Sequence, residues 1–298
     1  MARICPVCGA PGSARKFSTR DPHYGIPGEW WIRECPDCES FFLENPPSEV
    51  ELEALYPKSY YAYSIVRSSP VKTFLQRVLF YDKATREPHF ERPGSMLDFG
   101  SGAGEFLLSM QAAGWQCAGV EISAAARDVA RANGLDVRPA LLGAHGFEPG
   151  RFDYVRANHS LEHVMHPDET LRLMFQLLKP GGTLFIGVPT NSSESARIFG
   201  TSWWGLTAPL HTFVPSKRGM KQLVERTGFT VTRLSTNGDY TSTAGSLQIA
   251  LNRGTSRKSN EGILFILRPL LLAGHWLARI QDLRGVGDKL ELIAVKPA

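Results

Sequence analysis

Four cysteines stand in two Cys-x-x-Cys pairs near the start of the chain, Cys5 with Cys8 and Cys35 with Cys38. Proline follows the first cysteine of each pair, and turns of this kind let two thiolates face one ion. Two such turns give the closed, tetrahedral arrangement of structural zinc, which leaves no ligand position for water. A redox role is disfavoured because neither pair lies in a βαβ pattern. We therefore predict a structural zinc ion in a zinc ribbon over residues 1–45.

A second group of residues has the pattern of a loop that binds a nucleoside. A short apolar run over residues 95–99 is followed by alternate glycines and then by helical periodicity. The glycines allow the backbone to pass close beneath a ligand, which side chains would obstruct. Glu121 follows a second predicted strand, where its carboxylate can accept hydrogen bonds from ribose hydroxyls. The pattern predicts a nucleoside cofactor bound by Gly100, Gly102, Gly104 and Glu121.

The order of the glycines distinguishes between possible cofactors. A dinucleotide loop reads G-x-G-x-x-G and holds a pyrophosphate, whereas this loop reads D-x-G-x-G-x-G with Glu105 where the last glycine would fall. An acidic residue there would repel phosphates. Asp98, which precedes the glycines, suits a cationic ligand with an amino group, and S-adenosylmethionine (SAM) carries both a sulfonium and an ammonium group. The loop therefore favours SAM.

These residues resemble motif I of class I SAM-dependent methyltransferases, and the resemblance covers about residues 1–236. Within that family, the chain is similar to a subfamily often found in gene clusters for surface glycans and natural products. This subfamily frequently has the same paired cysteines and a tyrosine-rich linker, which here contains Tyr56, Tyr60, Tyr61 and Tyr63. The further matching segments are a fourth strand at 152–155, a Leu-Glu-His turn at 158–164, a helix-to-strand junction at 179–184, a His-x-x-Phe segment at 209–215 and a helix and strand start at 223–229.

The resemblance implies an α/β fold with a Rossmann-like core built on a mostly parallel seven-stranded sheet. It divides the chain into the zinc ribbon, a helical linker over 46–94, a SAM-binding core over 95–190 and a substrate cap with C-terminal strands over 191–298. The implied cofactor contacts are Asp98, Gly100, Gly102, Gly104, Phe106, Glu121, Ile122 and Asn158.

The chain departs from the family pattern in two places. After the third predicted strand, residues 139–142 offer no acidic or polar side chain for the adenine, so that contact stays unassigned. The last two strands, which form a hairpin in the family, are separated here by an apolar insert over 237–288. We expect this insert to hold substrate-specific structure.

Two histidines are candidate proton acceptors for methyl transfer. His211 lies in the predicted cap, after Trp203 and Trp204, which either stack on a substrate or pack in the core. His159 is the alternative base, and His163 is expected to brace the loop beneath the cofactor. Residues 159–163 also match the H-x-x-E-H motif of zinc peptidases, but the following His-Pro interrupts the helix which that motif needs.

The resemblance implies methyl transfer to a sugar hydroxyl in glycan or natural-product biosynthesis. Sugar C-methylation, RNA methylation and non-catalytic SAM binding are the alternatives. The net charge of +4, without a basic block, does not require nucleic acid as a partner. The apolar stretch 263–273 suggests a dimer contact or a membrane-surface contact. Because the sequence shows neither a signal peptide nor a membrane span, we expect a cytoplasmic protein.

Overall fold

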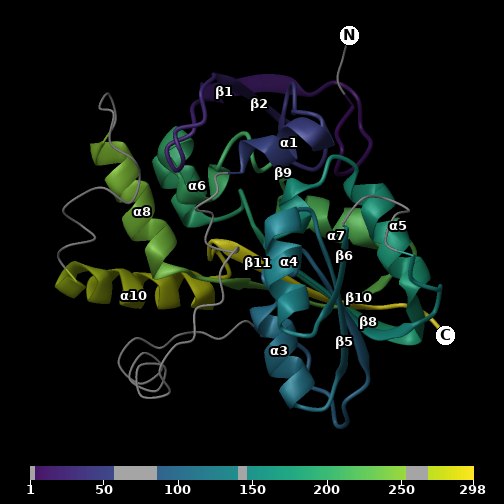
Figure 1. Ribbon diagram of the computed structural model, residues 1–298. Helices are drawn as coiled ribbons and strands as arrows, with labels where there is room; N and C mark the ends of the chain where they lie inside the picture. Colours follow the sequence, from purple (N-terminus) through teal and green to yellow (C-terminus); the bar gives the residue numbers. More distant parts are fainter. Residues whose placement is uncertain (1–3, 57–85, 140–145, 253–267) are drawn as a thin grey trace.

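The computed structural model describes residues 4–56, 86–139, 146–252 and 268–298, and Figure 1 shows their arrangement. A small sheet from the N-terminal residues covers one end of a larger α/β core. Among the described residues, no helix combines the length and the apolar character needed to cross a membrane.

The core is built on a seven-stranded sheet in the order β10-β11-β8-β7-β4-β5-β6. Every neighbouring pair is parallel except the two made by β11, which runs antiparallel to β8 and to β10. This arrangement confirms the predicted Rossmann-like fold with a mostly parallel sheet. The strands are β4 (Ser95–Phe99), β5 (Gln116–Glu121), β6 (Asp136–Pro139), β7 (Phe152–Asn158), β8 (Leu178–Pro189), β10 (Thr230–Asn237) and β11 (Lys289–Val295).

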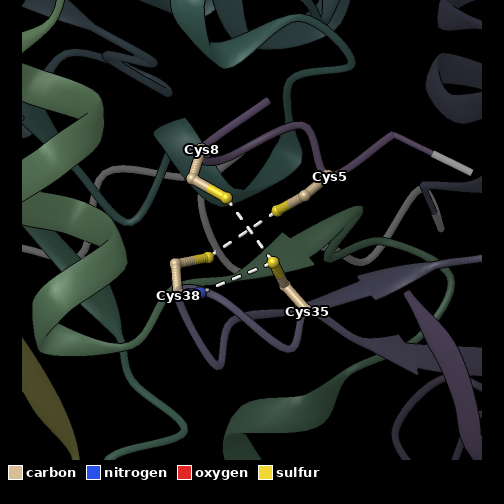
Figure 2. A group of neighbouring side chains, drawn as sticks. All are labelled: Cys5, Cys8, Cys35 and Cys38. Carbon is tan, nitrogen blue, oxygen red and sulfur yellow. Dashed lines mark hydrogen bonds between the residues drawn. The ribbon is translucent and has the colours of Figure 1, made fainter. Parts of the chain in front are cut away.

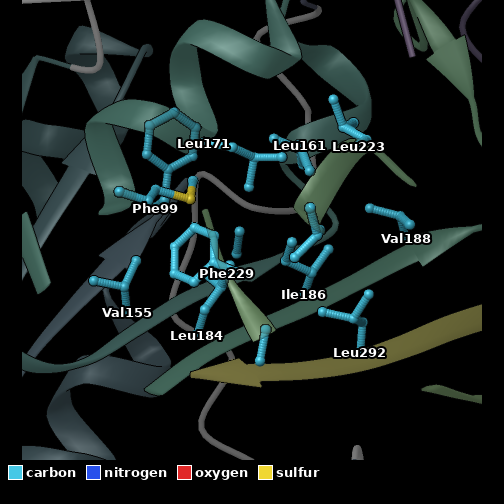
Figure 3. Close-up of a cluster of buried hydrophobic side chains, with 14 of the residues drawn as sticks. Phe99, Val155, Leu161, Leu171, Leu184, Ile186, Val188, Leu223, Phe229 and Leu292 are labelled. Atoms are coloured by element: carbon cyan, nitrogen blue, oxygen red, sulfur yellow. The ribbon is translucent and has the colours of Figure 1, made fainter. Parts of the chain in front are cut away.

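Successive side chains of a strand point to opposite faces of the sheet. Both faces of this sheet carry apolar side chains, and helices cover both of them. Tyr154 packs on the side of α3 (Glu105–Ala112) and α4 (Ala124–Ala132). The next residue, Val155, packs on the side of α5 (Pro167–Leu177) and α7 (Lys217–Glu225), in the larger cluster drawn in Figure 3. With both faces buried, the carboxyl ends of the parallel strands are the place for a ligand.

The N-terminal sheet has the order β1-β2-β3-β9, and its last strand comes from a distant part of the chain. Phe41 pairs with Val214, and Phe42 pairs with Phe213. The predicted zinc ribbon therefore completes its sheet with residues of the predicted cap. The elements of this region are β1 (Ala14–Thr19), β2 (Trp30–Glu34), β3 (Phe41–Leu43), β9 (Phe213–Val214) and the following helix α1 (Glu49–Leu55).

The described residues of the insert between the last two strands include the helices α8 (Tyr240–Leu251) and α10 (Arg268–Leu283), which lie together at the left of Figure 1. Most of the tyrosine-rich linker, the adenine region at 140–142 and the first part of the apolar stretch 263–273 lie outside the described residues. The short helices of the cap and of the Leu-Glu-His turn are α6 (Glu194–Phe199), η2 (Leu161–His163), η3 (Gly200–Ser202) and η4 (Trp204–Leu206).

Candidate functional site

The structure brings the four predicted zinc ligands together, as Figure 2 shows. Their sulfur atoms all lie within 4.8 Å of one another, and the facing pairs are Cys5 with Cys38 at 3.7 Å and Cys8 with Cys35 at 3.5 Å. None of the four forms a disulfide. This set of soft donors fits a tetrahedral zinc ion.

Both cysteine turns have the same backbone hydrogen bonds. Gly9 N donates to Cys5 O, and Glu39 N donates to Cys35 O. The contact between Cys5 and Cys38 lowers the pKa of the Cys38 thiol to about 5 and raises the pKa of Cys5. A lowered pKa favours the thiolate, which is the form that binds metal.

The predicted cofactor loop connects β4 to α3 at the carboxyl edge of the sheet. Its three glycines, Gly100, Gly102 and Gly104, have φ values of 77°, 55° and 88°. A side chain at Gly100 would also collide with the Leu-Glu-His turn, because its Cβ would lie 2.4 Å from Ser160 Cβ. The loop and this turn are therefore neighbours, and only glycine permits their close approach.

Glu121 lies at the end of β5 beside the glycine loop. It is buried, and its two carboxylate oxygens accept hydrogen bonds from Gly102 N and Ser123 N, each at 2.9 Å. These amides fix the carboxylate in position, and each oxygen retains a lone pair that a ribose hydroxyl could use. The following residue, Ile122, is half-buried, and its carbonyl accepts a hydrogen bond from Arg127. Ribose binding by Glu121 stays a prediction.

Asp98 is paired within the protein. Its Oδ1 accepts a hydrogen bond from Arg156 Nη1 at 3.0 Å, and Arg156 also donates to Glu87 Oε1 at 2.7 Å. Burial raises the pKa of Asp98 to about 6, while the Arg156 guanidinium acts in the opposite direction. The same guanidinium lies 3.8 Å from the centre of the Phe106 ring. The charge of Asp98 is thus already balanced, so its predicted contact with a cationic ligand stays a prediction.

Several buried polar atoms near the loop have no hydrogen-bond partner among the described residues. They include Ser101 Oγ, Asn158 Oδ1 and Ser160 Oγ. Buried polar groups are normally paired, so these atoms are suited to hydrogen bonds with a bound polar molecule. Together with the glycine loop and Glu121, they offer hydrogen-bonding groups that suit a nucleoside carrying an amino acid, such as SAM.

Glu162 is a buried carboxylate among histidines at the carboxyl edge of the sheet. Its side chain is 0% exposed, and neither carboxylate oxygen accepts a well-formed hydrogen bond from a described residue, although His159 Nδ1 lies within reach of Oε1. Three imidazoles surround it: His159 Nδ1 lies 3.4 Å from Oε1, His211 Nε2 lies 4.0 Å from Oε1, and His163 is the third. Although burial opposes ionisation, the three histidines lower the pKa of Glu162 to about 2. The structure thus brings both predicted bases to one carboxylate.

The two predicted bases differ in accessibility. The His211 side chain is 12% exposed, its Nδ1 is bonded to Gly205 O at 2.9 Å, and burial lowers its pKa to about 3. The His159 side chain is 43% exposed and follows the end of β7 with a φ of 55°. A hydrogen bond of 2.7 Å from its backbone N to Gly187 O holds this left-handed conformation. His159 is therefore the imidazole that a substrate can reach more easily.

The remaining alternatives from the sequence concern tryptophans and the peptidase motif. Trp203 is 1% exposed and its Nε1 donates to Asp288 at 3.2 Å, so it is a core residue. Trp204 packs edge-on against His23 at 4.5 Å between ring centres. The H-x-x-E-H segment contains only a short 3-10 turn at Leu161–His163, which does not supply the peptidase helix.

Sequence reasoning missed two residues of this edge. Arg156 is a charged residue within an apolar strand, and such a residue requires a buried partner. Glu162 is interpreted from the sequence as part of the peptidase motif or as a brace beneath the cofactor, although a carboxylate flanked by histidines is itself a metal-ligand pattern. Both signals were present in the sequence.

Comparisons with known proteins match the part of the chain that forms the carboxyl edge of the sheet to methyltransferases. The family model described as "Methyltransferase domain" matches residues 70–234, which is more than half of the chain. Among curated proteins, the Ubiquinone biosynthesis O-methyltransferase of Azoarcus sp. (strain BH72) is 35% identical over 111 residues, covering 35% of this chain and 47% of the relative. That of Bordetella pertussis is 33% identical over 107 residues, covering 34% and 44%. The matched region thus spans about half the length of these relatives.

The fold also has counterparts among solved structures. Phosphoethanolamine N-methyltransferase 2 of Haemonchus contortus, solved in complex with S-adenosyl-L-methionine, superposes with a TM-score of 0.52. It is 18% identical, and the match covers 87% of this chain and 62% of that one. At this identity the likeness concerns the fold alone.

Proposed function

Because the chain belongs to the methyltransferase domain family, we propose that it transfers a methyl group from SAM to an oxygen atom of a small-molecule acceptor. The observation that carries the proposal is the junction of two segments at the carboxyl edge of the sheet. There the glycine loop contacts Ser160, and the turn that contains Ser160 also presents His159 and Glu162. A cofactor loop and candidate proton-transfer groups are thereby neighbours.

The residues proposed to bind the cofactor are those at the glycine loop. When bound, SAM supplies a methyl group on a positively charged sulfur. The glycine backbone would lie beneath it, Glu121 would accept hydrogen bonds from its ribose, and Asn158 Oδ1 has no other partner among the described residues. The Phe106 ring, held by Arg156, would provide an apolar wall.

His159 is the proposed proton acceptor, and His211 is the alternative. Glu162 faces Nδ1 of His159 and favours the tautomer with hydrogen on that nitrogen, which leaves the lone pair on Nε2. Nε2 can then take the proton of an acceptor hydroxyl. His211 is less suited to this role because its side chain is nearly enclosed and its low pKa makes it a weak base.

The acceptor is proposed to be a hydroxyl, since the curated relatives are named O-methyltransferases. Within that class, a sugar hydroxyl is the finer proposal, supported by the paired cysteines and the segment around His211 that this chain shares with the glycan-cluster subfamily. A phenol is the alternative that the relatives' name suggests. A panel of sugar nucleotides and catechols, assayed for methylated product by mass spectrometry, distinguishes the two.

The catalytic assignment is tested by comparing three variants. His159→Gln should lower turnover by about 100-fold or more, the usual effect of losing a general base, while SAM affinity measured by calorimetry stays unchanged. His166→Gln is the matched control, because His166 is an exposed histidine of the same segment. If His211→Gln alone lowers turnover and added imidazole restores it, the base is His211.

Two further proposals concern zinc and partners. The four cysteines are proposed to hold a structural zinc ion that stabilises the N-terminal sheet.

The proposed contact of residues 263–273 with a membrane surface or a second copy is supported by neighbouring exposed side chains of α10, where Trp276, Ile280 and Leu283 are 63%, 50% and 83% exposed. Co-sedimentation with lipid vesicles and analytical ultracentrifugation would separate these partners.

A further inference from the structure

The buried carboxylate of Glu162 needs a positively charged partner, because hydrogen bonds do not compensate its charge. The carboxylate is completely buried, and neither oxygen accepts a well-formed hydrogen bond from a described residue, since His159 Nδ1, 3.4 Å from Oε1, makes only a weak contact. An ionised carboxylate in such surroundings is costly unless a cation compensates it. The backbone of the residue is firmly held, because Thr212 N donates to Glu162 O at 2.9 Å. The backbone thus fixes the position from which the carboxylate faces the imidazoles.

Two histidines beside this carboxylate are oriented in the way that metal-binding histidines are. His163 Nδ1 lies 2.9 Å from the backbone oxygen of Leu210, and His211 Nδ1 lies 2.9 Å from that of Gly205. A carbonyl oxygen only accepts, so each Nδ1 carries the hydrogen and each Nε2 keeps its lone pair. Such an outer hydrogen bond to a carbonyl fixes the tautomer and the ring orientation of a metal ligand.

The ligand atoms of these residues converge. One atom each from Glu162, His163 and His211 lie within 4.8 Å of one another. The two imidazole rings are edge to face, with ring centres 4.8 Å apart. Tyr56 OH, 2.9 Å from His163 Nδ1, provides a further contact that holds this ring. Three donor atoms held at this spacing by outer contacts lie close enough together to bind one ion.

We propose that Glu162, His163 and His211 bind one divalent transition-metal ion. Two imidazoles and one carboxylate suit ions such as Mn²⁺, Fe²⁺ or Zn²⁺, whereas the four-thiolate site suits zinc. Three protein ligands leave coordination positions open, in contrast to the closed cysteine site. The chain would then hold two metals of different chemistry.

The position of this site suggests its use, which rests on the proposed function. Glu162 belongs to the turn that contacts the glycine loop through Ser160 and Gly100. An ion there would bind the acceptor hydroxyl and lower its pKa. The hydroxyl proton would pass to Nε2 of His159, whose side chain is the most exposed of the three. His211 would in that case act as a ligand.

The test uses the full chain with its cysteine site loaded with zinc, titrated with Mn²⁺ while free Mn²⁺ is followed by electron paramagnetic resonance. Mn²⁺ is chosen because thiolate sites favour zinc. One Mn²⁺ per chain is expected. Glu162→Gln, which conserves shape, and His211→Asn should each weaken binding by more than about 100-fold, since losing only an outer partner of a ligand costs about 10- to 100-fold. His166→Gln should bind as the wild type does.

The outcomes are separable from those of the proposed function. Absence of Mn²⁺ binding, with Zn²⁺ binding limited to the cysteines, would overturn the site. Binding that survives both Glu162→Gln and His211→Asn would overturn it as well. Circular dichroism checks that each variant is folded. SAM affinity measured without Mn²⁺ tests the cofactor site alone, so its loss would count against the proposed function and not against the metal site.

Discussion

Asp98 and Arg156 are register partners on the adjacent parallel strands β4 and β7, and their side chains are joined by a hydrogen bond of 3.0 Å. Both residues are buried, and Arg156 extends the network to Glu87. The pair lies in the strands that lead into the glycine loop and the Leu-Glu-His turn. Loss of this ion pair should therefore disturb both the glycine loop and the Leu-Glu-His turn.

Removing the cation of this network should destabilise the protein. Arg156→Met leaves Asp98 and Glu87 without their counterion, so we expect the free energy of unfolding in urea to fall by about 3–5 kcal/mol. The double variant Asp98→Asn, Arg156→Met should recover part of the loss, because the buried acid is then neutral. Equal stability of Arg156→Met and wild type would show that the pair is not buried as described.

Removing the Glu121 carboxylate should weaken cofactor binding. Glu121→Ala deletes the acceptor for ribose hydroxyls and the partner of Gly102 N, and we expect SAM affinity to fall by about 1–3 kcal/mol. Isothermal titration calorimetry measures this change. Glu148→Ala, at an exposed acid, is the control. Unchanged affinity in Glu121→Ala would place the ribose elsewhere.

Loss of a zinc ligand should loosen the N-terminal sheet. Elemental analysis of the wild type should give at least one zinc ion per chain, and Cys38→Ser should lower the zinc content. Hydrogen exchange in β1, β2 and β3 should then accelerate, while β4 and β5 keep their protection. Cys117→Ser is the control, because this cysteine lies on β5 and outside the cluster. A disulfide among the four cysteines of the purified protein would contradict the assignment.

The buried carboxyl of Asp288 should make stability depend on pH. Burial raises its pKa from 3.8 to about 6, although Ser195 and Trp203 donate hydrogen bonds to it. Between these values the native state binds more protons than the unfolded state, so this group's contribution to stability falls as pH rises. The free energy of unfolding of Asp288→Asn minus that of wild type should therefore increase from about pH 4 to pH 6, by at most about 3 kcal/mol. A difference independent of pH would exclude the raised pKa.

Local patterns were sufficient to predict the main parts of the site. The loop from Asp98 through Gly104 and the paired cysteines are short motifs whose chemistry is encoded in adjacent residues. The apolar run, the alternate glycines and the helical periodicity that follows predicted the strand, the loop and the helix that the structure contains. Domain boundaries, site roles and partners stay predictions, because neither the fold nor the relatives test them.

Long-range pairing was not predictable in the same way. Nothing near Phe213 indicates that it pairs with Phe42, because a two-residue strand carries no periodicity. The pairing depends on the docking of the ribbon, where Ser216 N donates to Ser40 Oγ at 3.1 Å. The clustering of three histidines around Glu162 likewise requires the chain near residue 211 to return to the end of β7.

The shared strand β9 imposes an order on biosynthesis. During translation the cysteines emerge first and can bind zinc early, but β3 has an unpaired edge until Phe213 and Val214 have been made. An unpaired edge is a template for pairing with other chains. The nascent ribbon is thus exposed to aggregation throughout synthesis of the core, and a fragment that ends before β9 should be less soluble than the whole chain.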